Sequence, residues 1–359
     1  MDFNRFSEGV RELVEKTQLF GSEPLEAVLL ANPRAGGFSR PARAAALTRD
    51  LAQAVSDASA LPARSASLSW RVAQTSGPRH ATRLASEYLE EAAMKPGRAW
   101  LIVLACGDGT SLEFLDELSR APDELRSRFT VLRLPMGTGN DGSDGRELSD
   151  SLSRLTGRGA IAVQPTLRVI PAPGGPASRR APGGEWRAFN IASVGLDAYV
   201  TDTTNKLKTS LPGDSYKLVL DLASVLYDKL YPPREMIITA RSSDGTELSR
   251  REGRFLLVAM GVSGRRTYGS NKPILPDDDN VCAVDQMPLL RKVALKGPVS
   301  SGKIRDFPEA SLFSADLVEI AYADRILVQM DGEAELLVAE DFPLRFEKTA
   351  PLIRHIARA

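Results

Sequence analysis

Apolar positions in the first 140 residues fall into short runs that alternate with segments of helical spacing. The runs predict strands at 27–30, 69–74, 100–104 and 129–134, and the spacing predicts helices at 6–19, 43–55, 79–94 and from 114 onwards. Strands that alternate with helices in this way form a parallel sheet with helices on both faces. The first part of the chain is therefore predicted to be a doubly wound α/β domain.

The pattern changes after residue 160, where short strand-like runs are separated by turn residues. These strands are predicted at 166–170, 186–191, 235–241, 254–259, 281–284, 317–321 and 325–330. One helix is predicted at 216–228, and the Pro-, Gly- and Arg-rich segment 171–185 is predicted to be a flexible hairpin loop. The predicted fold class is α/β plus β, with a C-terminal antiparallel, β-sandwich-like domain.

Composition excludes several classes of protein. The 46 basic and 46 acidic residues cancel, so charge gives no reason to expect a nucleic-acid partner. Two cysteines far apart in sequence, Cys106 and Cys282, favour a reducing compartment and no disulfide framework. No apolar run approaches the ~20 residues of a transmembrane segment, and the charged N-terminus has no signal-peptide core. We therefore expect a cytoplasmic protein whose membrane contact, if it has any, is peripheral.

Candidate chemistry begins where the strand 100–104 ends, at Gly107-Asp108-Gly109-Thr110. A strand that breaks at glycines and opens a helix presents bare backbone N–H groups, which suit phosphate. The carboxylate of Asp108 would repel phosphate unless a cation lay between them, and Mg²⁺ bound to a nucleotide would meet this need. Gly-Asp-Gly-Thr taken alone is also an ordinary turn.

Three further turns follow the other predicted strands of the first domain. Asn32-Pro33-Arg34-Ala35-Gly36-Gly37 follows the first strand, Thr75 follows the second, and residues 135–141, Pro-Met-Gly-Thr-Gly-Asn-Asp, follow the fourth. Ligands of parallel sheets bind at the carboxyl ends of the strands. All four turns are predicted to lie at such ends, and the two glycine turns that follow the third and fourth strands are predicted to share one ligand.

Three polar groups lie in the second half, and each has an alternative interpretation. Asp331-Gly332-Glu333 alone predicts a turn with a solvent-facing glutamate, although carboxylates that alternate on an extended segment can face one side of a strand. The acidic run 277–279 is either a solvated turn or a cation site. Lys206, Lys208 and Lys217 form either a solvated face or a contact for lipid headgroups or phosphate.

Taken together, the motifs resemble the diacylglycerol kinase catalytic domain family, which includes sphingosine kinases and bacterial lipid kinases and is distantly related to NAD kinases. The resemblance runs from residue 27 to residue 333, and Gly137-Thr138-Gly139-Asn140-Asp141 is its most specific element. The other matching residues are Asn32, Pro33, Gly36, Thr75, Gly107, Asp108, Gly109, Thr110, Glu113, Asn190, Gly195, Asp197, Ala198, Tyr268, Gly269, Pro276, Asp279, Asp331, Gly332 and Glu333.

The chain also departs from the family pattern. Cys106 replaces the first glycine of the loop, and Leu112 replaces the asparagine before Glu113. Asn271 and Asn280 stand where the family has glycines, and Gly142-Ser143 replaces an apolar residue and an alanine.

The resemblance implies ATP and Mg²⁺ as cofactors. The implied nucleotide-binding residues are Asn32, Pro33, Gly36, Thr75, Gly107, Asp108, Gly109, Thr110, Glu113, Gly137, Thr138, Gly139, Asn140 and Asp141. Asp108 would act through the Mg²⁺ of ATP, and Asp279 is tied to a structural Mg²⁺. Glu333 is favoured as the general base for the acceptor hydroxyl, with Asp331 positioning metal or backbone.

The domains implied are an N-terminal helical extension (1–24), a nucleotide-binding α/β domain (25–160) and a β-rich substrate domain (161–359) whose C-terminal segment packs back on the first domain. The implied activity is ATP- and Mg²⁺-dependent phosphorylation of a lipid hydroxyl, diacylglycerol-like or sphingoid-like, at a membrane surface. An exposed β edge would allow a homodimer. Two alternatives stay open: NAD kinase-like phosphorylation of a soluble substrate, and a catalytically degenerate regulator that binds nucleotide or lipid.

Overall fold

The computed structural model divides the chain into two compact units, Met1–Gln164 with Pro351–Ala359, and Pro165–Ala350. It describes residues 2–137, 140, 142, 144–145, 147–208, 226–268 and 272–359. Each unit has its own hydrophobic core. The predicted fold class, a parallel α/β unit followed by an antiparallel β unit, is confirmed.

The first unit is built on a six-stranded sheet in the order β2-β1-β3-β4-β20-β5. The strands are β1 (Leu25–Ala31), β2 (Leu68–Gln74), β3 (Ala99–Ala105), β4 (Phe129–Arg133), β5 (Gly159–Gln164) and β20 (Ile353–Arg358). Strands β1 to β4 are parallel to one another, and β20, from the end of the chain, pairs in parallel with β4 and antiparallel with β5. Because β1 and β3 are flanked on both sides, every residue in them is buried, which explains their continuous apolar runs.

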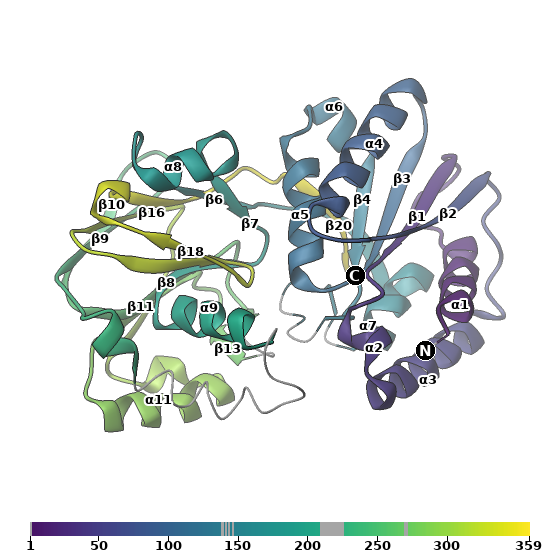
Figure 1. The fold of residues 1–359 in the computed structure, drawn as a ribbon. Coiled ribbons are helices and arrows are strands. Elements are labelled where there is room, and N and C mark those ends of the chain that lie inside the picture. The colour runs from purple at the N-terminus through teal and green to yellow at the C-terminus, as the bar shows by residue number, and fades with distance from the viewer. Residues whose placement is uncertain are drawn as a thin grey trace. The chain divides into compact units, whose positions relative to one another are not determined.

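Helices cover both faces of this sheet (Figure 1). They are α1 (Phe3–Lys16), α2 (Gly36–Ser39), α3 (Pro41–Ala58), α4 (His80–Met94), α5 (Asp108–Arg120), α6 (Asp123–Arg126), α7 (Leu148–Ser153) and the π-helical turn η1 (Arg154–Arg158). Helix α1 is amphipathic, and Phe6, Val10, Leu13 and Val14 are fully buried in the core that it shares with α3. This burial makes α1 a packing helix.

The described part of the second unit contains two six-stranded antiparallel sheets, in the orders β10-β9-β16-β19-β6-β7 and β15-β14-β11-β8-β17-β18, and the two-stranded sheet β12-β13. Its strands are β6 (Leu167–Ile170), β7 (Trp186–Ala188), β8 (Ile191–Gly195), β9 (Met236–Arg241), β10 (Glu247–Gly253), β11 (Phe255–Gly261), β12 (Arg266–Tyr268), β13 (Lys272–Leu275), β14 (Val281–Asp285), β15 (Ala310–Phe313), β16 (Leu317–Tyr322), β17 (Ile326–Met330), β18 (Glu333–Leu337) and β19 (Leu344–Lys348). Apolar residues of both sheets, among them Val169, Val194, Val258 and Phe346, form one core, as in a sandwich.

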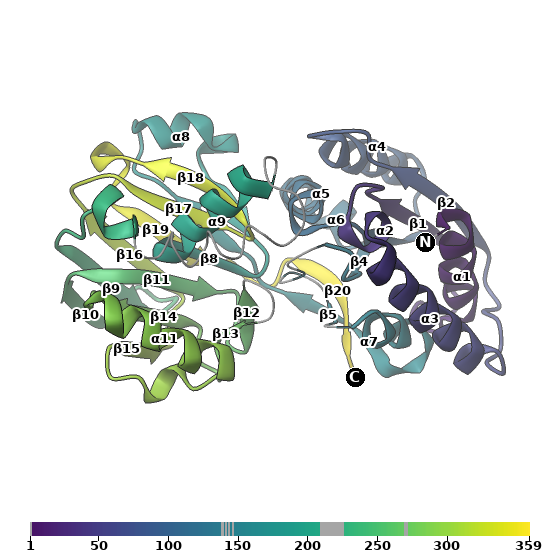
Figure 2. The same ribbon diagram turned by 60° about the horizontal axis from the view of Figure 1, so that its bottom comes forward.

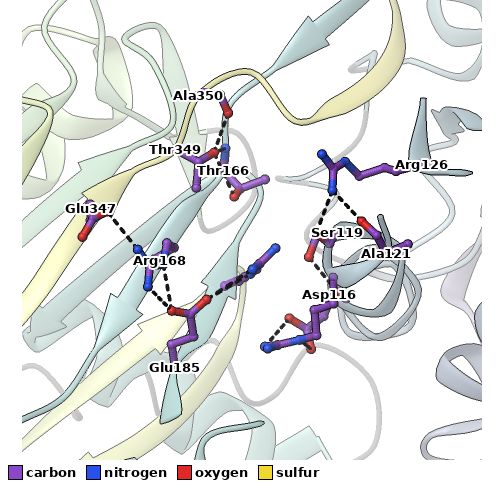
Figure 3. A network of polar contacts seen from close by, with 12 residues as sticks. Asp116, Ser119, Ala121, Arg126, Thr166, Arg168, Glu185, Glu347, Thr349 and Ala350 are labelled. Atoms are coloured by element: carbon purple, nitrogen blue, oxygen red, sulfur yellow. Dashed lines mark hydrogen bonds and ion pairs between the residues drawn. The ribbon is translucent and has the colours of Figure 1, made fainter. Parts of the chain in front are cut away.

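Within the described residues, the second unit also contains these helices and 3₁₀ turns. They are α8 (Pro176–Arg180), α9 (Leu196–Lys208), α11 (Leu289–Ser301), η2 (Pro182–Gly184), η3 (Ile304–Asp306) and η4 (Ala339–Asp341). Helices α9 and α11 flank the sheet that contains β8 and β14 (Figure 2), where Leu257, Cys282, Leu295 and Val299 share a second core. Arg168 on β6 donates to Glu185 at 2.7 Å and to Glu347 on β19 at 2.9 Å (Figure 3).

Two predicted elements differ from the structure, and a third is only partly described. Segment 171–185 contains α8 and η2, because the buried Asp341 carboxylate accepts the N–H of Ala177 at 2.7 Å at the start of α8. The predicted strand 186–191 is two strands, β7 and β8. Of the predicted helix 216–228, residues 226–228 are helical and the rest lies outside the described residues, as does Lys217.

Across the described ranges, we find no helix that combines the length and the apolar character needed to cross a bilayer.

Candidate functional site

The glycine turns that follow β3 and β4 meet through their backbones. Gly107 is the N-cap of α5, and a Cβ at Gly137 would lie 2.9 Å from the Cα of Gly107. Only a residue without a side chain allows this approach at position 137. The contact leaves the first N–H groups of α5 beside a surface of bare backbone, which is an arrangement that suits anions.

The Asp108 carboxylate joins the two turns. Its Oδ2 accepts the backbone N–H of Asn140 at 3.1 Å, and its Oδ1 accepts that of Gly142 at 3.3 Å. Asn140 has a φ of 60°, a left-handed conformation that asparagine tolerates better than most residues. Asp108 therefore fixes the course of the second turn. Thr138, Gly139 and Asp141, which the sequence also assigns to the nucleotide, lie outside the described residues.

The turn after β1 is connected to both of these turns. The side-chain amide of Asn32 donates to Thr110 Oγ1 at 3.1 Å, and its Oδ1 accepts the N–H of Arg34 at 2.9 Å. The N–H of Gly37 donates to the carbonyl of Met136 at 2.8 Å. Pro33 is exposed, and Gly36 is the first residue of α2.

The turn after β2 is shaped by Glu113. Thr75 N–H donates to the carbonyl of Ala31 at 2.9 Å, which extends the pairing of β1 and β2 by one residue. Glu113 Oε1 accepts the N–H of Arg79 at 2.9 Å, just before α4 begins, and Arg79 has a φ of 59°. Glu113 thus fixes the backbone at the start of α4. All four turns lie at the carboxyl ends of four neighbouring strands, β2, β1, β3 and β4.

Cys106, which replaces a glycine of the family pattern, belongs to the core. Its side chain is buried, and its Sγ lies 3.3 Å from the hydroxyl of Ser111. Burial raises the pKa of this thiol to about 12. The thiol is therefore protonated at neutral pH and unreactive.

Beneath the second turn lies a buried ion network that motif reasoning missed. Arg133 on β4 donates to Asp144 at 3.3 Å, and His355 on β20 lies 3.2 Å from the same Asp144 oxygen. The side chains of Arg133 and Asp144 are only 6% and 2% exposed. Burial by itself would raise the pKa of Asp144, but the Arg133 guanidinium and His355 outweigh it and lower that pKa to about 2. No local pattern pairs residues 144 and 355, so only the fold reveals the network.

On the second unit, Asp331 and Gly332 form the two-residue turn between β17 and β18. Their φ values are 49° and 95°, as in a type I′ hairpin turn, so the predicted extended segment was wrong. The Asp331 carboxylate accepts the N–H groups of Phe189, Asn190 and Ile191. The Asp331 side chain therefore holds the backbone of residues 189–191. These contacts lie where β7 ends and β8 begins.

Glu333 is the first residue of β18 and is exposed to solvent. It pairs in register with Met330 across the hairpin. The Glu333 carboxylate thus lies on a two-stranded hairpin, while Asp331 anchors the turn that precedes it.

A second buried carboxylate lies behind this hairpin. Asp197, in the first turn of α9, accepts the hydroxyl hydrogen of Ser193, and Ser193 Oγ accepts from Gln329 at 2.8 Å. Gln329 Oε1 in turn accepts the N–H of Gly332 at 3.0 Å. Burial raises the pKa of Asp197 to about 6. The chain of contacts connects α9 to the Asp331-Gly332 turn.

Asp279, the residue tied by resemblance to a structural Mg²⁺, lies between β13 and β14 and is paired with Arg305. Within the described part of the chain, no group of three or more His, Cys, Asp or Glu side chains could hold a metal ion.

The chain thus has two units, of which the first is a parallel α/β unit with glycine and polar turns at the carboxyl ends of four neighbouring strands. Residues 26–153 match the family of diacylglycerol kinase catalytic domains, which confirms the resemblance for this part of the chain. No curated protein sequence shows a significant match.

Solved structures share the fold over nearly the whole length. A candidate diacylglycerol kinase from Bacillus anthracis strain Sterne is 16% identical with a TM-score of 0.58, covering 93% of this chain and 95% of that chain. A diacylglycerol kinase from the same strain is 15% identical with a TM-score of 0.55, covering 93% and 97%. Yeast NADH kinase in complex with NADH is 12% identical, covers 94% and 84%, and has a TM-score of 0.41, too low to support an argument.

Proposed function

We propose that this protein is a lipid kinase, which transfers the γ-phosphoryl group of ATP to the hydroxyl of a diacylglycerol-like or sphingoid-like acceptor. The observation that carries the proposal is the backbone contact of Gly107 with Gly137, braced by Asp108, inside the segment that matches the diacylglycerol kinase catalytic domain. Phosphoryl transfer requires mainly that the phosphates are positioned and their charge neutralised. A bare-backbone surface at a helix N-terminus meets the first requirement.

The residues present fit ATP with Mg²⁺. A side chain at 137 would fill the backbone cradle, and the exposed Arg34 and Arg79 lie at the ends of β1 and β2, where they would face anionic phosphates. Mg²⁺ keeps several of its waters and would be bound mainly by the ATP phosphates, so Asp108, whose oxygens accept the N–H groups of Asn140 and Gly142, would act on it through a bound water. When bound, Mg²⁺ would neutralise part of the negative charge of the ATP phosphates. Asn32 and Thr75 would line the nucleotide, and Glu333 would take the proton of the acceptor hydroxyl.

The activity test is incubation of the full chain with labelled ATP, Mg²⁺ and a total lipid extract, followed by identification of the labelled product. Parallel reactions with diacylglycerol, sphingosine and NAD as single acceptors separate the lipid kinase from the NAD kinase-like alternative. Nucleotide binding without transfer to any acceptor would instead indicate the catalytically degenerate regulator.

Replacing Asp108 by Asn is expected to weaken ATP binding about 10- to 100-fold, because an amide is a poorer acceptor for the N–H groups of Asn140 and Gly142 at about 1 kcal/mol for each weakened bond. The KM for ATP and a direct ATP titration measure the effect. Asp116→Asn on the same helix, whose carboxylate pairs with Arg120, is the matched control. Unchanged ATP affinity in Asp108→Asn would remove this loop from the nucleotide site.

A lipid acceptor requires the protein to meet a bilayer, and α11 has a surface that suits one. Leu290 and Val293 are 85% and 54% exposed, the helix carries no acidic residue, and Lys296 is also exposed. Apolar side chains beside a basic residue favour anionic membrane surfaces.

Leu290→Glu is expected to lower co-sedimentation with phosphatidylglycerol vesicles severalfold, because it places a charge in the apolar contact and repels anionic lipid. Met94→Glu is the control, since Met94 is similarly exposed on α4 of the other unit. Equal sedimentation of the wild-type chain and both variants would contradict membrane contact through α11.

A further inference from the structure

The acidic turn 277–280 is the position at which the family resemblance implies a structural Mg²⁺. A divalent cation of this kind is held by oxygen ligands, mainly ionised carboxylates and backbone carbonyls. A metal could bind here only if the carboxylates and carbonyls of this turn were not already bonded within the protein.

Two of the three carboxylates of the turn, those of Asp277 and Asp279, are engaged by one arginine, and the third, that of Asp278, pairs with Arg265. Arg305 Nε donates to Asp277 Oδ2 at 2.6 Å, and its Nη2 donates to Asp279 Oδ2. The remaining oxygens are also used: Asp277 Oδ1 accepts the N–H of Asp279 at 3.1 Å, and Asp279 Oδ1 accepts the hydroxyl hydrogen of Ser314 at 2.8 Å. All four carboxylate oxygens thus have partners within the protein.

The guanidinium of Arg305 takes the electrostatic role that a metal would have. A planar guanidinium that reaches two carboxylates with separate N–H groups cancels their mutual repulsion, as a divalent ion would.

The backbone of the turn is held by the protein as well. Asn280, which replaces a glycine of the family pattern, is buried, and its side chain donates to the carbonyl of Ala315 and accepts the N–H of Ala315, both at 2.9 Å. The carbonyl of Asp277 accepts the N–H of Arg265 at 2.6 Å. The backbone carbonyl of Asp277 is therefore already hydrogen-bonded within the protein.

We infer that Arg305 is a built-in cation that replaces the family's structural metal at the turn 277–280, so that the second unit folds without a divalent ion. Together, the hydrogen bonds of Asn280 and the ion pairs of Arg305 would hold the turn in place of a bound metal ion. The inference concerns the fold and is independent of the proposed kinase activity.

The first test is thermal unfolding of the full wild-type chain without nucleotide, in excess EDTA and in MgCl₂ or CaCl₂. We expect the same Tm in all three solutions, since the carboxylates of Asp277 and Asp279 are already paired with Arg305. A Tm that falls in EDTA and returns with Mg²⁺ or Ca²⁺ would overturn the inference, and this test requires no variant.

The second test is Arg305→Ala, which exposes the carboxylates of Asp277 and Asp279 to each other and to solvent. We expect a lower Tm in EDTA that Ca²⁺ or Mg²⁺ largely restores. Arg291→Ala is the matched control, because Arg291 is another partly exposed arginine paired with a carboxylate, that of Glu309, and its loss should be insensitive to cations. An Arg305→Ala protein with the same Tm in EDTA and in either cation would show that the guanidinium does not occupy a cation position.

Discussion

Glu333→Gln is expected to lower kcat for lipid phosphorylation by about 10²- to 10⁴-fold, the range for loss of a general base. The amide keeps the size of the side chain but cannot take the proton of an acceptor hydroxyl. Glu333 is exposed at the first position of β18, so the substitution should leave Tm unchanged. The measurement is kcat with the acceptor identified by the lipid assay.

The hairpin supplies its own controls for this experiment. Glu335→Gln lies two residues further along the same face of β18, where its carboxylate pairs with Arg180, and should retain full kcat. Asp331→Ala should act differently, because it removes the acceptor for three backbone N–H groups and destabilises the hairpin. If Glu333→Gln kept wild-type kcat, the base would have to be another residue.

Asp144→Asn is expected to lower the free energy of unfolding of the first unit by about 3–5 kcal/mol, because it leaves the buried Arg133 guanidinium without a counter-charge. Chemical denaturation at neutral pH measures the loss. Asp123→Asn is the control: Asp123 pairs with Arg126 but is 90% exposed, and exposed pairs contribute about 1 kcal/mol or less.

The same carboxylate makes stability depend on pH. Because the folded pKa of Asp144 is lowered to about 2, below the unfolded value of about 4, its contribution is fully present above pH 4 or so and is lost as pH falls toward 2. The difference in unfolding free energy between wild type and Asp144→Asn should therefore shrink over this acidic window. A difference that stays constant from neutral pH to pH 2 would show that Asp144 is not held ionised by Arg133 and His355.

The glycine and polar turns of the first unit were predictable because their signals are local. Each strand of the parallel sheet is a short apolar run, each run ends at glycine or polar turn residues, and parallel strands place those ends on one edge of the sheet. The role of Asp108 was less predictable. The motif suggests a carboxylate that acts through Mg²⁺, and the fold adds its bonds to the N–H groups of Asn140 and Gly142.

The polar residues of the second unit were harder to predict, because they act through partners far away in sequence. Asp331 bonds to residues 189–191, and Asp279 bonds to Arg305, so neither role has a local pattern. The helix α8 was missed for the same reason, since its N-terminus is capped by Asp341 from the other end of the unit.

By itself, the sequence determined the two classes of fold, the strand ends at which the glycine turns lie, and the family of residues 26–153, because hydrophobic period and turn chemistry act over a few neighbouring residues. Only the tertiary structure decided which charges are paired. Arg133 with Asp144 and His355, and Arg305 with Asp277 and Asp279, are brought together by strands and turns distant along the chain. Whether a carboxylate binds a metal, a backbone turn or an arginine depends on these distant partners.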